Sequence, residues 1–292
     1  MTRFTRFAVL DDTRRHPELS ERLSEILDTV APLVTETTGL PLPAEVRYRL
    51  LTPREWRNST RHNRQRILAR DLADLELKPE EVKVVPLALK IGSVVPVLVW
   101  PLVFASTVEA ADGQFETFLA PRSLHHSGFL TNEKCLTTMA AHELVHHAQF
   151  LARQGQAWET FFPDRRGIPL RCHSASTLIE GHATWAEQRI MARLFGAPVN
   201  HRQLAKRSVR YRIHAGFPGV RRLGPSLALY EQGTRLITHA VEACGIGVVN
   251  QVWQDTSLLP TAEDIAAPDT WAQRLTARWK VRGVAAKPVE RN

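Results

Sequence analysis

Two histidines one helical turn apart provide the strongest chemical signal in the sequence. In the segment HELVH, His142 and His146 can direct their imidazoles at a single metal ion if the segment is helical. Glu143 would then lie beside the ion without binding it, close enough to take a proton from a water that zinc has acidified. The pattern predicts Zn²⁺ as the cofactor, with the two histidines as metal ligands and Glu143 as the catalytic base.

A third protein ligand is needed if one zinc position is to remain open for water. One known arrangement places a glycine three residues and a histidine six residues after the second histidine. Gln149 and Ala152 occupy these two positions, so that arrangement is excluded. The alternative is a carboxylate from a later helix, and Glu180 in the segment LIEGHATW is the candidate.

The segment around Glu180 carries other groups that bear on the site. His182 is a rival ligand, but it lies about 200° around the helix from Glu180, so only one of them can face the metal, and we favour Glu180. A glycine inside a helix lowers stability by about 1 kcal/mol relative to alanine, so the presence of Gly181 needs a reason. We expect that it allows close packing against the HELVH helix. Glu187 lies on nearly the same face as Glu180, where it would either orient a ligand or form a surface ion pair.

A hydrolytic site also needs a hydrogen-bond donor for the oxyanion, opposite Glu143. We choose Tyr230 for its position beside a Gln-Gly pair, although each candidate also has a structural interpretation. The candidates are Tyr230, Tyr211, His214 and His239. We expect His125 and His126 to be solvated loop residues and Cys135 to be a small buried apolar residue.

Together, the segments HELVHHAQF and LIEGHATWAEQ resemble zincin-type metallopeptidases of the gluzincin class, in particular the bacterial peptidase MA-like proteins. In that group HExxH and a later EGxA glutamate bind zinc. The segments LYEQG, GIG and LPTAEDI resemble the helical tail of such proteins, so the resemblance spans roughly residues 114–271. The roles that it implies are His142, His146 and Glu180 as zinc ligands and Glu143 as catalytic base.

The resemblance implies an α+β zincin-like fold, with a small mixed sheet above the HExxH helix and a helical C-terminal lobe. Residues 114–120, QFETFLA, alternate as a strand does and would be the edge strand, to which an extended peptide could add by main-chain hydrogen bonds. The chain departs from the family's pattern in two ways. His147 and His182 are additional imidazoles, and residues 1–110 resemble no family that we recognise.

Hydrophobic periodicity predicts the elements that position these residues. A strand at residues 45–50 leads into Thr52, Pro53 and Glu55, which together form a helix N-cap signature. Helices closed by glycine are predicted at residues 17–38, at the active helix 132–153 and at the third-ligand helix 174–195. We divide the chain into an N-terminal helical and strand region, residues 1–110, and a catalytic region, residues 111–292, whose helical lobe spans residues 226–282.

The most apolar stretch, residues 84–105, is long enough to span a membrane. Because Lys90 and three prolines interrupt it, we expect a buried or interfacial segment instead. The helix that follows Thr52 carries a cationic face, which is either solvated or in contact with an anion or a membrane surface. This face consists of Arg54, Arg57, Arg61 and Arg64.

The composition is that of a globular protein of 292 residues, 43% hydrophobic and 23% charged. Three cysteines without CxxC spacing favour a reducing compartment. The first residues lack the apolar run of a secretory signal, so we expect a cytoplasmic protein, with membrane association as an alternative. The net charge of +8 favours anionic partners, but no recognised motif accompanies the basic residues 201–222, so we expect no specific nucleic-acid partner.

The function that these residues favour is zinc-dependent hydrolysis of peptide bonds in a peptide or protein substrate. The first alternative is a zinc hydrolase of a small amide metabolite, which the same residues would serve. The second is a non-catalytic protein that binds a membrane or a partner, and a coordination site blocked by His182 or His147 would favour it. The sequence leaves the oligomeric state open.

Overall fold

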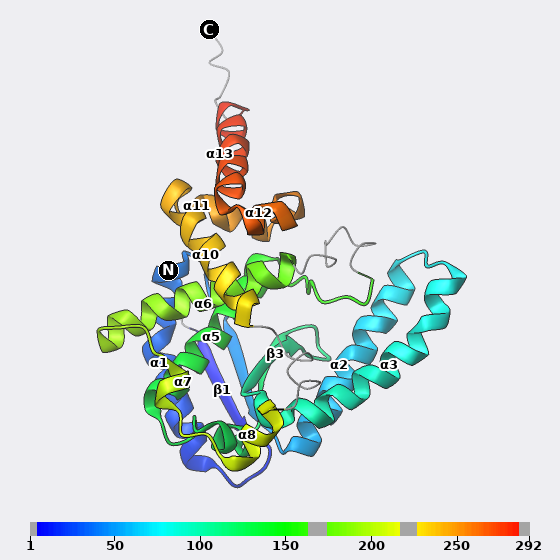
Figure 1. Cartoon of the computed structure of the whole chain (residues 1–292), viewed down its shortest axis with the longest axis vertical. Helices are drawn as coiled ribbons and strands as arrows, with labels where there is room; N and C mark the ends of the chain where they lie inside the picture. Colours follow the sequence, from blue (N-terminus) through cyan, green and yellow to red (C-terminus); the bar gives the residue numbers. More distant parts are fainter. Residues whose placement is uncertain (1–4, 163–173, 217–226, 286–292) are drawn as a thin grey trace.

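A four-stranded mixed sheet supports the helices that carry the candidate site (Figure 1). The structure is a computed structural model that describes residues 5–162, 174–216 and 227–285. The strands are β1 (Arg6–Asp11), β2 (Glu45–Leu50), β3 (Ala105–Glu109) and β4 (Phe115–Leu119). In the order β1-β2-β4-β3, the first three strands are parallel and β3 is antiparallel to β4. This mixed sheet among many helices confirms the predicted fold class.

The helix α1 (Pro17–Thr38) connects the parallel strands β1 and β2. Its apolar stripe, which includes Leu23, Leu27 and Val30, is fully buried. The helix ends at Gly39, whose φ of 66° lies in the left-handed region that favours glycine. The predictions for α1 and β2 are confirmed, whereas β1 was not expected because its residues lack the clear alternation of a half-buried strand.

The helix α5 (Glu133–Ala152) occupies the centre of the fold. It packs against α1, against the helix α6 (Ser174–Phe195) and against β3 and β4. Leu136, Ala140 and Leu144 are fully buried, and the Tyr48 hydroxyl of β2 donates to the carbonyl of Ala140 at 3.1 Å. The α6 helix has the predicted bounds, and α5 begins and ends one residue inside the predicted range 132–153. Neighbours on several sides hold α5 in place.

The helices α2 (Pro53–Asp74) and α3 (Pro79–Val99) form a hairpin that projects from one side of the sheet (Figure 1). The predicted capping box is present: Thr52 and Glu55 exchange hydrogen bonds at the start of α2. The short 3₁₀ helix η1 (Trp100–Leu102) links α3 to β3, so the apolar residues 84–105 are divided among three elements. Within the described ranges, no helix is both long and apolar enough to cross a membrane.

The edge strand of the sheet is β3. The prediction that residues 114–120 form the edge was wrong, because the chain preceding the turn at Gly113 folds back and pairs with β4. Thr107 lies opposite Thr117 in this antiparallel pair. β4 is therefore an inner strand, and all of its residues are buried. β3 was not predicted from the sequence, and only its first residue, Ala105, belongs to the apolar stretch 84–105.

Shorter helices and a helical C-terminal lobe complete the described chain. They are α4 (Pro121–Ser127), α7 (His201–Leu204), α8 (Val209–Gly216), α10 (Leu227–Cys244), α11 (Ile246–Val249), η3 (Asn250–Trp253), η4 (Thr256–Leu258), α12 (Ala262–Ala266) and α13 (Pro268–Ala285). Residue 226 at the start of the predicted lobe and residues 217–222 of the predicted basic segment lie outside the described residues.

Two glycines let α6 and α10 meet at backbone distance. A Cβ atom added at Gly181 would lie 2.3 Å from the carbonyl carbon of Gly233, and one added at Gly233 would lie 2.2 Å from the carbonyl oxygen of Thr177. The expectation that Gly181 packs against α5 was wrong, because the space where a Cβ atom would lie is occupied by the backbone of α10. This contact brings Tyr230, one turn before Gly233, next to the helix that carries Glu180.

We predict that Gly181→Ala lowers the free energy of unfolding by about 3 kcal/mol, because the new methyl group would overlap backbone that cannot move aside as a side chain can. Gly247→Ala is the matched control, since no atom lies within 4 Å of its added Cβ. Urea denaturation of both variants measures the difference. Equal stability of the two variants would contradict this account of the contact.

Candidate metal centre

The histidine pair of α5 lies on one face of the helix. Leu144 and Val145 between them are fully buried, which fixes the rotation of the helix and turns the pair away from the core on that side. The imidazole rings of His142 and His146 are 4.9 Å apart between centroids and almost perpendicular. Both side chains are largely buried, with 14% and 12% of the side chain exposed.

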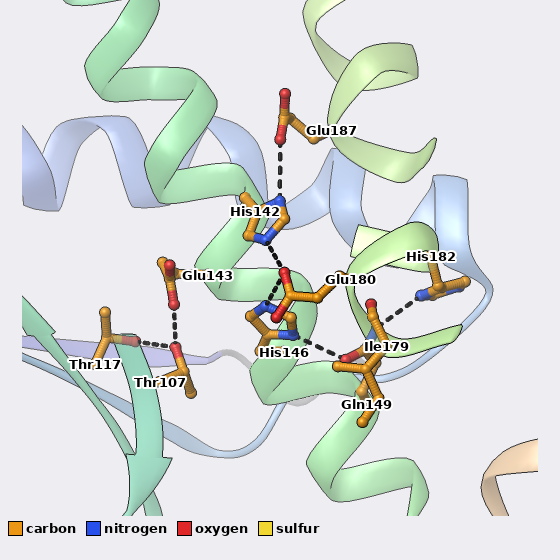
Figure 2. A network of polar contacts seen from close by, with 10 residues as sticks. All are labelled: Thr107, Thr117, His142, Glu143, His146, Gln149, Ile179, Glu180, His182 and Glu187. Atoms are coloured by element: carbon orange, nitrogen blue, oxygen red, sulfur yellow. Dashed lines mark hydrogen bonds and ion pairs between the residues drawn. The ribbon is translucent and has the colours of Figure 1, made fainter. Parts of the chain in front are cut away.

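Glu180 approaches the pair from α6 (Figure 2). Its Oε2 atom lies 3.2 Å from Nε2 of His142 and 3.9 Å from Nε2 of His146. One donor atom from each residue lies within 4.8 Å of the others, which is close enough for the three to hold one ion. Tetrahedral zinc with ligands at about 2.0–2.1 Å places them about 3.3 Å apart, so the donor types and spacing fit zinc.

The imidazoles and the carboxylates of this group stabilise one another's charged forms. Burial alone would raise the pKa of Glu180, but the hydrogen bond from His142 and the charge of His146 lower it to about 2. Burial likewise opposes the charge of His142, yet hydrogen bonds to Glu180 and Glu187 raise the pKa of His142 well above its usual value. The site therefore stabilises positive charge next to Glu180, which is what a bound cation requires.

Second partners orient both imidazoles. Glu187 accepts a hydrogen bond from Nδ1 of His142 at 3.0 Å, and the Gln149 side-chain oxygen accepts one from Nδ1 of His146 at 2.9 Å. With hydrogen on Nδ1, Nε2 of each ring faces Glu180 and is the atom that can bind a metal once it carries no hydrogen. Glu187 thus has the orienting position rather than that of a surface ion pair. Sequence reasoning missed Gln149, although its spacing of three residues from His146 placed it on the same helix face.

The Gln149 amide also explains where His182 points. Its nitrogen donates to the carbonyl of Ile179 at 3.0 Å and to Nδ1 of His182 at 3.1 Å. His182 is fully buried between Trp185 and Trp253, away from the three donor atoms, and burial lowers its pKa to about 3. The rival ligand is therefore a neutral core residue.

Glu143 faces the sheet side of the site. Thr107 of β3 donates a hydrogen bond to its Oε2 atom at 2.6 Å. The Thr107 hydroxyl lies 2.8 Å from that of Thr117, which in turn lies 2.9 Å from Nε2 of His147. His147 is thus directed at the sheet, and burial lowers its pKa to about 3. Sequence reasoning missed both threonines, because only the β3–β4 pairing brings them to Glu143.

Of the four oxyanion candidates, Tyr230 is the one that contacts the possible metal ligands. Its hydroxyl hydrogen-bonds to Glu180, its ring centroid is 6.3 Å from that of His142, and burial with the charge of Glu180 raises the pKa of its phenol well above the usual value. Tyr211, on α8 with His214, stacks on Phe104. His239 faces Asp269 at 3.3 Å.

The remaining candidates from the sequence, Cys135, His125 and His126, do not belong to the group of possible metal ligands. Cys135 is fully buried, as expected, and burial raises the pKa of its thiol. The prediction that His125 and His126 lie in a loop was wrong, because both belong to the helix α4. His125 is exposed, whereas Nδ1 of His126 lies 3.1 Å from the Ser208 hydroxyl.

A cleft of about 1890 Å³ opens in front of the candidate centre. Its lining includes His142, Glu143, Tyr230 and residues of the edge strand such as Ser106 and Val108. Further walls come from the α2 helix and from α10. The candidate ligand His142, the base Glu143 and the edge strand therefore open onto the same space.

A comparison with protein families finds a match in the C-terminal part of the chain. Residues 162–272 match a family described as zincin-like metallopeptidase. The predicted resemblance to zincin-like proteins is confirmed. The matched region contains Glu180 and Tyr230 but begins after the HExxH helix, so the match and the motif are separate observations.

A solved structure is similar over almost the whole chain. It is a crystal structure from Chloroflexus aurantiacus, described as that of a candidate hydrolase with a novel fold. It shares 20% identity and a TM-score of 0.60 over 90% of this chain and 91% of its own. This similarity extends to the fold alone. No curated protein matches the chain.

We predict that the purified protein binds about one equivalent of zinc and that Glu180→Gln weakens this binding more than about 100-fold, because an amide oxygen is a poor substitute for a carboxylate ligand. Glu231→Gln, which neutralises another carboxylate that lines the cleft, should leave the affinity unchanged. Competition titration with a chromophoric chelator measures both. Equal affinity of the two variants would remove Glu180 from the ligand set.

We also predict that zinc affinity falls as the pH is lowered. The raised pKa of His142 means that a proton occupies its imidazole over a wide pH range, and this proton must leave before Nε2 can bind a metal. Chelator titrations between about pH 5 and pH 8 measure the slope. An affinity that is constant across this range would show that no proton is displaced.

Proposed function

We propose that this chain is a zinc-dependent metallopeptidase that hydrolyses peptide bonds in an extended peptide or protein substrate. The observation that carries the proposal is the convergence of His142, His146 and Glu180 next to a cleft that His142, Glu143 and the edge strand line. The zincin-like family match supports the same chemistry.

The chain's own residues divide the work of hydrolysis. Zinc held by the three candidate ligands would supply Lewis acidity, which lowers the pKa of a nearby water to about 7. Glu143 accepts the proton of that water and later returns it to the leaving amine. Tyr230, whose hydroxyl hydrogen-bonds to Glu180, turns that hydroxyl toward the developing oxyanion.

The edge strand β3 offers main-chain groups to a peptide. Ala110 donates its backbone N–H to the carbonyl of Gln114, so its backbone groups face the chain of β4. In an antiparallel pair every second residue faces the partner strand, and the residues between direct their N–H and C=O groups away from it. Ala105, Thr107 and Glu109 are such residues of β3. The Glu109 carbonyl already accepts hydrogen bonds from Asn63 and from an arginine of α2. Ala105 and Thr107 therefore remain as the main-chain partners for an added strand.

The size of the cleft favours a peptide over a small amide metabolite. Sites for small molecules usually enclose about 300–1000 Å³, whereas this cleft measures about 1890 Å³. A centre blocked by His147 or His182 would have favoured the non-catalytic alternative. Both imidazoles have other partners, on the sheet and on Gln149, which argues against that alternative.

We predict that Glu143→Gln keeps zinc bound and lowers peptide hydrolysis by about 10²–10⁴-fold, because the amide cannot accept the proton. Cleavage of a mixed peptide library, read by mass spectrometry, is the measurement. Glu242→Gln is the control, because Glu242 is exposed on α10. Hydrolysis by the Glu143→Gln variant at the wild-type rate would refute the proposed function.

We predict that Tyr230→Phe lowers kcat by about 10²–10³-fold with little change in KM, since the lost hydroxyl acts on the oxyanion of the transition state. Tyr211→Phe, which alters a tyrosine that lines the same cleft, should have little effect. Steady-state kinetics on one peptide from the library compare the two. The reverse order of effects would transfer the oxyanion role to Tyr211.

A further inference from the structure

The hydrogen-bonded chain that ends on Glu143 begins deep in the core. Thr117 is fully buried, and His147 is 1% exposed. The ring of His147 stacks on that of Tyr48, with centroids 5.9 Å apart, and Tyr48 is itself anchored to α5 through its hydroxyl. The imidazole that starts the chain is therefore fixed by packing on one side and by a hydrogen bond on the other.

The chemistry of the four groups sets the direction of every bond. An ionised carboxylate can only accept, so Thr107 donates its single hydroxyl hydrogen to Glu143. Thr107 must then accept from Thr117, and Thr117, having donated its hydrogen, must accept from His147. One arrangement satisfies all three contacts, and in it His147 carries hydrogen on Nε2.

We propose that Thr107 is a positioning residue for Glu143, and that Thr117 and the Nε2–H tautomer of His147 orient its hydroxyl toward the carboxylate. This inference rests on the proposed function, in which Glu143 is the base. Because Thr107 donates to Oε2 of Glu143, Oε1 is the oxygen that remains to accept the proton (Figure 2). The same hydrogen bond keeps the carboxylate in one orientation during the reaction. The edge strand thus serves the base as well as the substrate.

Kinetics of paired variants test the role of the Thr107 hydroxyl. Thr107→Val keeps the shape and strand preference of threonine but removes the hydroxyl, and we expect kcat to fall about 10–100-fold with KM and zinc content unchanged. Thr107→Ser restores the hydroxyl and should restore most of the rate. Unfolding midpoints of both variants separate loss of fold from loss of function. Wild-type kcat in the valine variant would overturn the proposal.

The tautomer of His147 provides a readout that is independent of activity. In zinc-free protein labelled with ¹⁵N-histidine, we expect the His147 ring to show hydrogen on Nε2, and Thr117→Val to abolish this preference. Hydrogen on Nδ1 in the wild-type protein would overturn the proposal. Absence of peptide hydrolysis by the zinc-loaded wild-type protein would instead refute the proposed function, and the tautomer would still decide the direction of the hydrogen bonds.

Discussion

The contact of the Glu180 carboxylate with two imidazoles is the interaction on which the rest of the site depends. A buried carboxylate is costly unless opposite charge and hydrogen bonds compensate for the lost water, and His142 and His146 provide both. They can do so only because α6 lies directly against α5. Gly181 of α6 in turn allows α10 to pack directly on α6, which brings Tyr230 to the same point.

Each group at the centre has a partner that fixes its orientation. Glu187 and Gln149 hold the two candidate ligands by their Nδ1 atoms, and Thr107 holds the base. A metal centre preorganised in this way loses little conformational entropy when it binds an ion or a transition state. The additional imidazoles, which the sequence left as rivals or obstacles, act instead as members of this supporting layer.

Local periodicity and capping were sufficient to predict much of the fold. The bounds of α1, α5 and α6 and the capping box of α2 follow from patterns within one segment, because helix formation depends on neighbours three or four residues away. β1 and β3 escaped prediction, and β4 was misplaced at the edge. Strand pairing joins segments that are distant in the chain, so no local pattern distinguishes an inner strand from an edge strand.

The amino-acid sequence alone established the HExxH helix, a carboxylate on a second helix and the zincin-like resemblance. Those features are encoded by spacing within single helices. Packing between elements determined that Glu180 rather than His182 meets the histidines, that Gly181 faces α10, and that two threonines reach Glu143. A side chain's partner across the fold depends on how whole elements rotate and approach one another, and that is fixed by the combined burial of many residues rather than by any one segment.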